Sequence, residues 1–179
     1  MRVISGTARG RKLVSPDGDS VRPTLDRVKE SIFNMLSFSI ADASVLDLFA
    51  GSGALGIEAL SRGAKSAVFV DKNAASLSIV RQNLQLTHLE DKALCVQNDF
   101  ASYLSSAQDT FDLIFLDPPY AAGFMESALT LIKERKLLRE SGIIVCESDS
   151  GDEIVSPEAF SVYRNKKYGK ARILLMKEL

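Results

Sequence analysis

The stretch "DLFAGSGALG", residues 47–56, decides the fold that we expect of this chain. An apolar run, "SVLDLF" (residues 44–49), leads into three closely spaced glycines, Gly51, Gly53 and Gly56, and a helical pattern follows. Glycines at a strand-to-helix turn let a ligand approach the backbone closely and face it with the helix N-terminus. The stretch therefore predicts the ligand-binding loop of a Rossmann-like α/β sheet.

Downstream of this loop, short apolar runs alternate with helical patterns. The expected strands are residues 44–49, 66–71, 92–97, 111–116 and 141–148, with two more in residues 160–177 around a turn at Tyr168 and Gly169. The expected helices are residues 53–63, 73–86 and 124–133. Near-continuous apolar strands separated by helices predict a mostly parallel sheet of seven strands covered on both faces, with an antiparallel C-terminal hairpin.

The N-terminal part reads differently from the rest. Residues 2–5 and 12–15 are short β-favouring pieces on either side of a loop with glycine and arginine, which predicts a β-hairpin. "RPT", residues 22–24, then begins a helix with Thr24 as its N-cap. We expect a basic hairpin extension to precede the core.

Length and composition indicate one domain. The expected organisation is a single domain over residues 1–179, with a hairpin extension at 1–20 and a Rossmann-like core at 44–179. A hydrophobic content of 46% and a charged content of 25% are typical of soluble globular proteins. No apolar run approaches the roughly 18 residues needed to span a bilayer, and the N-terminus lacks a signal-peptide pattern. We therefore expect a cytoplasmic protein without a membrane partner.

The cysteines argue against a metal site, and the distribution of charge favours a polyanionic partner. Cys95 and Cys146 stand alone without metal-ligand spacing, so we expect reduced thiols and no metal site. The net charge of −1 hides seven basic against four acidic groups in residues 1–30, and residues 163–172 hold five basic groups and no acid. Such clusters suit a polyanion such as nucleic acid, although a solvated surface is the alternative for each.

The glycine pattern leaves two cofactors open. Gly51, Gly53 and Gly56 match the G-x-G-x-x-G pattern of dinucleotide-binding proteins, with Asp71 as the acid about 20 residues on, which makes an NAD-dependent dehydrogenase one hypothesis. Asp47 argues for S-adenosylmethionine instead. Its carboxylate would repel a pyrophosphate and could bind the amino group of a ligand.

Acidic residues also follow three successive strands. Asp71, Asp99 and Asp117 come after the second, third and fourth strands, whose carboxyl ends converge on one crevice in a parallel sheet. S-adenosylmethionine carries an amino group, a ribose diol, an adenine amine and a sulfonium, each of which suits an acceptor or a negative field. One such aspartate could be only a helix cap, but the four together with the glycine loop favour this cofactor.

"DPPY", residues 117–120, follows the fourth strand. Asp117 and the carbonyl of Pro118 could accept the two N–H groups of a planar amine, and the prolines lock the backbone that aims these acceptors. Tyr120 would stack on the base, a contact worth roughly 1–3 kcal/mol, which offsets part of the cost of flipping the base out. The alternative is a simple strand stop with Tyr120 on the surface.

Five segments carry a resemblance to a known family: "GTARGRKL", "RPTLDRVKESIFNML", "DLFAGSGALGIEALSRGA", "FVDKN" and "LIFLDPPY". Together they resemble the bacterial small-subunit ribosomal RNA guanine-N2 methyltransferase family over nearly the whole chain. The resemblance implies the seven-stranded class I methyltransferase fold, S-adenosylmethionine as cofactor (S-adenosylhomocysteine as product) and no metal. It also implies that a monomer methylates N2 of one guanine in 16S rRNA, within an assembled or partly assembled 30S subunit.

The resemblance also implies roles for individual residues. The implied cofactor-binding residues are Asp47, Phe49, Ala50, Gly51, Ser52, Gly53, Asp71, Lys72, Asp99 and Phe100. The implied catalytic residues are Asp117, Pro118 and Tyr120, and the implied RNA-binding residues are Arg9, Arg11, Lys12, Arg22 and Thr24. One departure is Asp71, where the family more often has glutamate, although the shorter side chain can still accept from a diol.

Three alternatives stay open from the sequence. The acceptor could instead be adenine N6 or a glutamine amide, although a glutamine-modifying enzyme more typically has asparagine in place of Asp117. An NAD-dependent oxidoreductase or a non-catalytic RNA-binding protein could share the fold. Calorimetric titration with S-adenosylhomocysteine and with NAD distinguishes a methyltransferase from an NAD-dependent oxidoreductase.

Overall fold

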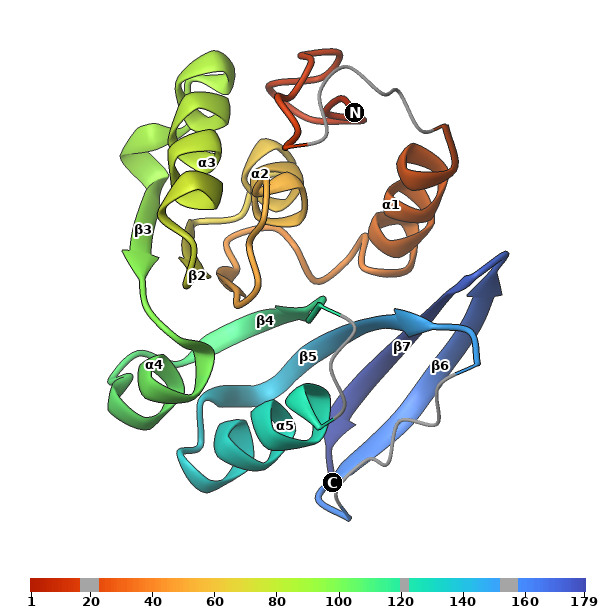
Figure 1. Ribbon diagram of the computed structural model, residues 1–179. Coiled ribbons are helices and arrows are strands. Elements are labelled where there is room, and N and C mark those ends of the chain that lie inside the picture. The colour runs from red at the N-terminus through yellow and green to blue at the C-terminus, as the bar shows by residue number, and fades with distance from the viewer. Residues whose placement is uncertain (17–22, 120–122, 152–157) are drawn as a thin grey trace.

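The computed structural model describes residues 1–16, 23–119, 123–151 and 158–179, and this part of the chain forms one seven-stranded sheet (Figure 1). Its strand order is β3-β2-β1-β4-β5-β7-β6. The strands are β1 (Ser44–Asp47), β2 (Ser66–Asp71), β3 (Ala93–Gln97), β4 (Phe111–Leu116), β5 (Leu138–Asp149), β6 (Phe160–Tyr168) and β7 (Ala171–Glu178). The first five pair in parallel, and β7 is antiparallel to both β5 and β6. The predicted mostly parallel sheet with an antiparallel C-terminal hairpin is confirmed.

Helices cover both faces of the sheet (Figure 1). One face carries α1 (Pro23–Met35), α2 (Ala54–Ser61) and α3 (Ala74–Thr87), and the other carries α4 (Phe100–Ser106) and α5 (Phe124–Glu134). A single 3₁₀ turn, η1 (Glu90–Lys92), precedes β3. Among the residues that the structure describes, no helix has both the length and the apolar character to cross a bilayer.

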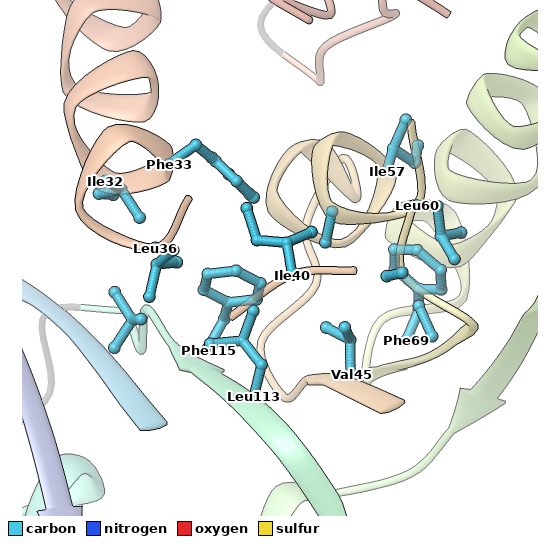
Figure 2. Packing of buried hydrophobic residues seen from close by; sticks show 14 of the residues in the cluster. Ile32, Phe33, Leu36, Ile40, Val45, Ile57, Leu60, Phe69, Leu113 and Phe115 are labelled. Carbon is cyan, nitrogen blue, oxygen red and sulfur yellow. The ribbon is translucent and has the colours of Figure 1, made fainter. Parts of the chain in front are cut away.

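Alternation along the central strands builds two apolar cores. Val45 and Leu113 belong to the cluster under α1, α2 and α3, whereas their neighbours Leu46 and Ile114 belong to the cluster on the α5 face. Side chains of successive strand residues point to opposite faces, so a strand buried on both sides must be apolar throughout. Figure 2 shows the first cluster, in which the rings of Phe33 and Phe115 lie 5.8 Å apart and fasten α1 to β4.

The N-terminal segment packs against the core of the domain and does not project from it as an extension. The predicted hairpin is present only as an isolated antiparallel bridge between Arg2 and Lys12. Val3, Ala8 and Leu13 are buried in the same apolar cluster as the central strands. These three side chains alternate with exposed basic ones, so the segment closes over α2 while its charges face solvent.

Two local expectations for helices are corrected. α1 begins at Pro23, so Thr24 lies inside the first turn and is not the N-cap that we expected. Proline fits the first helical position because its fixed φ is already helical and the missing N–H would be unpaired there anyway. The short helix α4 was not expected at all, because its sequence, "FASYLSS", is too brief and too rich in serine to show a helical period.

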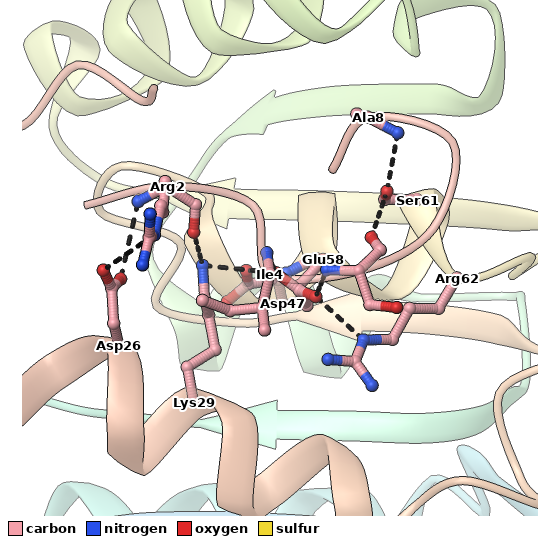
Figure 3. A network of polar contacts seen from close by, with 11 residues as sticks. Arg2, Ile4, Ala8, Asp26, Lys29, Asp47, Glu58, Ser61 and Arg62 are labelled. Carbon is pink, nitrogen blue, oxygen red and sulfur yellow. Dashed lines mark hydrogen bonds and ion pairs between the residues drawn. The ribbon is translucent and has the colours of Figure 1, made fainter. Parts of the chain in front are cut away.

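A buried carboxylate ties the N-terminal segment to two helices (Figure 3). Glu58 of α2 is fully buried and accepts the backbone N–H groups of Ile4 at 2.8 Å and Ser5 at 3.0 Å. The same carboxylate accepts from Arg62 Nε at 2.8 Å and pairs with Lys29 Nζ of α1 at 3.3 Å. These partners offset the cost of burying the Glu58 carboxylate, which is high for a charge that is neither paired nor hydrogen-bonded.

α1 is also joined to the C-terminal hairpin. The Ser31 hydroxyl of α1 forms a hydrogen bond with the Tyr168 hydroxyl at the end of β6. Lys29, on the same helix, donates from Nζ to the carbonyl of Arg2 at 2.5 Å. α1 is thereby held between the first and the last parts of the chain.

Candidate functional site

A cleft of about 190 Å³ opens where the carboxyl ends of β1, β4 and β5 face α1. Its walls come from the N-terminal residue, α1, the glycine loop, the start of α2 and the ends of three strands. The lining residues are Met1, Val28, Lys29, Ile32, Asp47, Phe49, Ala50, Gly51, Ser52, Ala54, Leu55, Asp117 and Glu147. Ligands of open parallel sheets bind at this edge, so the cleft lies where the strand pattern predicted it.

Three carboxylates from neighbouring strands meet in this cleft. Asp47 ends β1, Asp117 directly follows β4, and Glu147 lies near the end of β5. Leu116 and Cys146 are partners in the β4–β5 register, so Asp117 and Glu147 are the next residues on two adjacent strands. Because side chains alternate along a strand, both carboxylates leave the α5 face and point toward α1 and α2.

The electrostatics of the three carboxylates are coupled. Burial raises the pKa of Asp47 to about 7. The hydrogen bond from the Gly56 N–H lowers this pKa, whereas the charge of Asp117 raises it. Burial raises the pKa of Asp117 to about 6, although the side chain still reaches the solvent of the cleft. Burial and the charge of Asp117 raise the pKa of Glu147 to about 7. A cation in the cleft would relieve this repulsion and favour the ionised forms.

Lys29 carries the one cationic side chain among the described residues that line the cleft. Burial lowers its pKa, while the neighbouring Glu58 raises it. Its Nζ is already bound by Glu58 and by the carbonyl of Arg2, so it does not neutralise the three carboxylates across the cleft. Among the side chains that line the cleft, three carboxylates therefore face one lysine that is already paired.

The glycine loop places a carboxylate at the start of α2. Gly53 has a φ of 77° and precedes the helix, a conformation that favours glycine. A Cβ on Gly56 would lie 2.3 Å from Cε1 of Phe69, so only glycine lets α2 approach β2 this closely. The Gly56 N–H donates to Asp47 Oδ2 at 3.0 Å, which fills the helix N-terminus with a protein carboxylate. A pyrophosphate would need that same position.

Asp71 supports the loop from the next strand. Its Oδ2 accepts the Gly51 N–H at 3.0 Å and its Oδ1 accepts the Asn73 N–H at 2.8 Å. A carboxylate offers about four acceptor positions, so two remain for a ligand diol. The adjacent Lys72 is exposed, and its carbonyl accepts from Gln97 at 3.4 Å. Neither Asp71 nor Lys72 is among the residues that line the cleft itself.

Asp99 is a helix cap as well as a strand-end acid. Its Oδ1 accepts the N–H groups of Ala101 at 3.0 Å and Ser102 at 3.3 Å at the start of α4. The following Phe100 has its ring 5.3 Å from that of Phe49 and 5.2 Å from that of Phe124. The three rings therefore form an aromatic row from Phe49 in the cleft wall to Phe124 at the start of α5. A flat ring system could pack against this row.

The remaining predicted site residues are placed as follows. Pro118 is half-buried in the irregular segment after β4, and Tyr120 lies outside the described residues. Arg9, Arg11 and Lys12 are exposed on the N-terminal segment. Arg22 lies outside the described residues, and Thr24 is in the first turn of α1.

Three residues of this region were missed from the sequence. Glu147 ends the apolar run "GIIVC", so the same strand-end rule that selects Asp117 would have found it. Lys29 and Phe124 give no such signal, because a helical lysine and a helical phenylalanine are read as a surface charge and a core residue. Among the residues that the structure describes, no group of three or more histidine, cysteine or acidic side chains could hold a metal ion.

Comparison with known proteins finds relatives that match nearly the full length of this chain. A protein of Bacillus subtilis, YlbH, provisionally named an rRNA methyltransferase, is 43% identical over 184 residues, covering 99% of each chain. The Escherichia coli "Ribosomal RNA small subunit methyltransferase D" is 37% identical over 171 residues, covering 95% of this chain and 86% of that protein. The solved structure of Escherichia coli yhhF, provisionally named a methyltransferase, has a TM-score of 0.88 at 35% identity and covers 99% of this chain and 97% of the other. The model of the family described as "Conserved hypothetical protein 95" matches residues 1–177, and this chain belongs to that family.

Proposed function

We propose that this protein transfers a methyl group from S-adenosylmethionine to the N2 amine of a guanine in small-subunit ribosomal RNA. The observation that carries the proposal is the cleft with three carboxylates, Asp47, Asp117 and Glu147, at the end of a class I methyltransferase sheet. The names of the relatives supply the substrate class, since the Escherichia coli relative is named for small-subunit ribosomal RNA. The choice of guanine N2 rests on the sequence resemblance.

The residues present fit this cofactor. Asp47, buried and beside the glycine loop, would hold the ammonium group of the cofactor, and Phe49 to Gly53 would surround its methionine part. Asp71 would accept from the ribose diol with its remaining acceptor positions, with Lys72 beside it on the exposed side. Asp99 and Phe100 would bind the adenine at the aromatic row. When bound, the cofactor supplies an electrophilic methyl group.

NAD fits less well at the same loop. The Asp47 carboxylate occupies the N-terminus of α2 through its 3.0 Å hydrogen bond from Gly56, where a pyrophosphate would bind in a dinucleotide-binding protein. Two like charges brought into this site would repel each other. The carboxylates instead favour a ligand with a positive charge.

The chain's own residues account for the activation of the amine. The exocyclic nitrogen of guanine is a poor nucleophile because its lone pair is delocalised into the ring. Asp117 and the carbonyl of Pro118 accept its N–H groups and hold the nitrogen in line for attack, with Tyr120 stacked on the base. Formation of the new C–N bond would be matched by cleavage of the methyl–sulfur bond, with S-adenosylhomocysteine as the neutral leaving group. The nitrogen would then be cationic, and Asp117 would take up the proton that it releases. The pKa of about 6 leaves this carboxylate ionised at neutral pH.

The RNA would reach the cleft over the basic N-terminal segment. Arg9, Arg11 and Lys12 are exposed, while the apolar residues between them anchor the segment in the core. We further propose that Arg22 and Thr24 contribute contacts. The substrate in this proposal is 16S rRNA within an assembled or partly assembled 30S subunit in the cytoplasm, and the proposed active form is a monomer.

Mass spectrometry of ribosomal RNA tests the proposal directly. Small subunits from a strain lacking the protein should miss one methylguanine, and the purified protein with S-adenosylmethionine should restore it at N2. Calorimetric titration should show binding of S-adenosylhomocysteine and not of NAD. Methylation of an adenine, or tight binding of NAD, would overturn the assignment.

A further inference from the structure

We propose that Glu147 identifies the target base as guanine, by accepting the N1–H of the base while Asp117 accepts the neighbouring N2–H. This inference rests on the proposed function and adds the group that distinguishes guanine from other bases carrying an amine. Two adjacent donors on the edge of the base would thus meet two adjacent carboxylates of the cleft.

The sheet register sets the two carboxylates side by side. Leu116 of β4 is the partner of Cys146 of β5, so the residues that follow them, Asp117 and Glu147, leave neighbouring parallel strands at the same level. Neighbouring strands lie about 4.8 Å apart, a spacing that an N1–H and an N2–H on one base edge can bridge with slightly convergent side chains. Both side chains line the cleft.

Glu147 is also available to a ligand. Within the described part of the chain, no backbone or side-chain group donates a hydrogen bond to its carboxylate, and Lys29 across the cleft is engaged by Glu58 and the carbonyl of Arg2. A half-buried carboxylate next to a second one, without a donor, is costly in the free protein. Two donors brought by a base would remove part of that cost.

The chemistry selects guanine over the other amino-bearing bases. Guanine carries a hydrogen on N1 next to its amine, whereas adenine and cytosine carry an unprotonated ring nitrogen in the equivalent position. A carboxylate opposite such a lone pair would repel it, and a buried acceptor would stay unpaired. Asp117 alone would accept from any planar amine, so the second carboxylate supplies the discrimination.

Replacing the target guanine by 2-aminopurine, in the wild type and in Glu147 variants, tests this contact. 2-Aminopurine keeps the amine on C2 but lacks O6 and has no hydrogen on N1, which is an acceptor instead. The change of the preference on substituting Glu147 therefore reports the N1 contact, because the loss of O6 is the same for every variant. Reconstituted small subunits would carry either base at the position mapped by mass spectrometry, in 16S rRNA ligated from synthetic and transcribed pieces. Methyl transfer from S-adenosylmethionine then gives kcat/KM for each base.

The wild-type protein is expected to prefer guanine by roughly 10- to 100-fold, the range for one hydrogen bond to a buried charge. In Glu147→Gln the amide can accept from guanine N1–H or donate to the lone pair of 2-aminopurine, so this preference should fall by roughly 10-fold or more. Glu147→Asp keeps the carboxylate and should keep the preference at a lower kcat/KM. Glu140→Gln, exposed on the same strand, is the matched control.

Calorimetry with S-adenosylhomocysteine shows that each variant keeps its fold and cofactor site. A Glu147→Gln variant that binds this ligand and still prefers guanine as strongly as the wild type does would overturn the role of Glu147 while leaving the proposed function in place. A wild-type protein that methylates neither base would overturn the proposed function, and with it this inference.

Discussion

Lys29 of α1 and Glu58 of α2 form an ion pair with 3.3 Å between Nζ and Oε2, and the two side chains are only 4% and 0% exposed. The pair lies directly behind the cleft, because Lys29 lines it and Glu58 holds the backbone of Ile4 and Ser5. Burying such a pair gains little compared with an apolar pair of the same volume, whereas breaking it leaves a charge without a partner. The pair therefore makes the position of the N-terminal segment depend on α1.

Glu58→Ala should be strongly destabilising. It leaves the buried Lys29 ammonium without its carboxylate and two partly buried backbone N–H groups without their acceptor. We expect the free energy of unfolding, measured by urea denaturation, to fall by about 3–5 kcal/mol. The matched control is Glu134→Ala on α5, which removes an exposed glutamate and should change the value by less than about 0.5 kcal/mol. Equal effects of the two substitutions would contradict a structural role for Glu58.

The three cleft carboxylates should make the free protein less stable as the pH rises from about 4 to about 7. Their pKa values in the folded protein are raised to about 7 for Asp47, about 6 for Asp117 and about 7 for Glu147. In the unfolded chain they titrate near 4, so the folded state binds more protons over this interval, and the free energy of unfolding falls with rising pH.

A triple amide variant, Asp47→Asn with Asp117→Asn and Glu147→Gln, isolates this contribution. The wild-type stability minus that of the variant should decrease steadily between pH 4 and 7 and level off above about pH 8. Urea denaturation without cofactor measures the difference at each pH. A difference that stays constant or increases with pH would show that these carboxyls are not protonated in the folded protein near neutrality.

Asp117→Ala should separate catalysis from cofactor binding. Asp117 is placed to accept from the amine and to take up its proton, so its loss should lower kcat by roughly 10²- to 10⁴-fold. S-Adenosylhomocysteine should still bind, because the glycine loop and Asp71 are unchanged. Asp109→Ala, exposed in the loop before β4, is the control and should leave kcat unaltered. Retained activity in Asp117→Ala would refute the role given to this carboxylate.

Replacing Arg9, Arg11 and Lys12 by alanine should weaken binding of small subunits and flatten its dependence on salt. Each lost phosphate contact reduces the slope of log K against log salt by roughly 0.7–0.9. Filter binding between about 50 and 200 mM salt measures this slope. Because these side chains are exposed, the stability of the protein should not change.

A second triple variant removes the same charge elsewhere. Lys65 before β2, Arg81 in α3 and Lys92 in η1 are exposed, and their replacement by alanine should leave the slope close to that of the wild type. If both triple variants lower the slope equally, the effect is one of overall charge, and the N-terminal segment is a solvated surface.

Much of the core could be predicted from the sequence because each strand is buried on both faces. Strands such as Ser66–Asp71 and Phe111–Leu116 match their expected bounds, since a continuous apolar run between turn residues leaves little freedom. The same reasoning placed Asp47 and Asp117 in one cleft. Glu147 follows the same rule, and the sequence contained the signal.

The helix α4 and the conformation of the N-terminal segment could not be predicted from local sequence patterns. α4 is held by the Asp99 cap and by packing of Leu104, and neither is visible as a period in seven residues. In the N-terminal segment, basic residues lie between short apolar pieces, and this pattern predicts a hairpin. The conformation of the segment is instead set by hydrogen bonds to Glu58 of α2, about 54 residues away. Contacts of this kind depend on the folded arrangement of distant residues.

The hydrogen bond between Ser31 and Tyr168 has a consequence for the order in which the molecule is assembled. The two residues are 137 positions apart, so α1, which forms one wall of the cleft, can make this contact only after residue 168 has left the ribosome. Closing so long a loop early in folding is entropically costly. A nascent chain can therefore build the central strands before α1 gains its contact with the C-terminal hairpin.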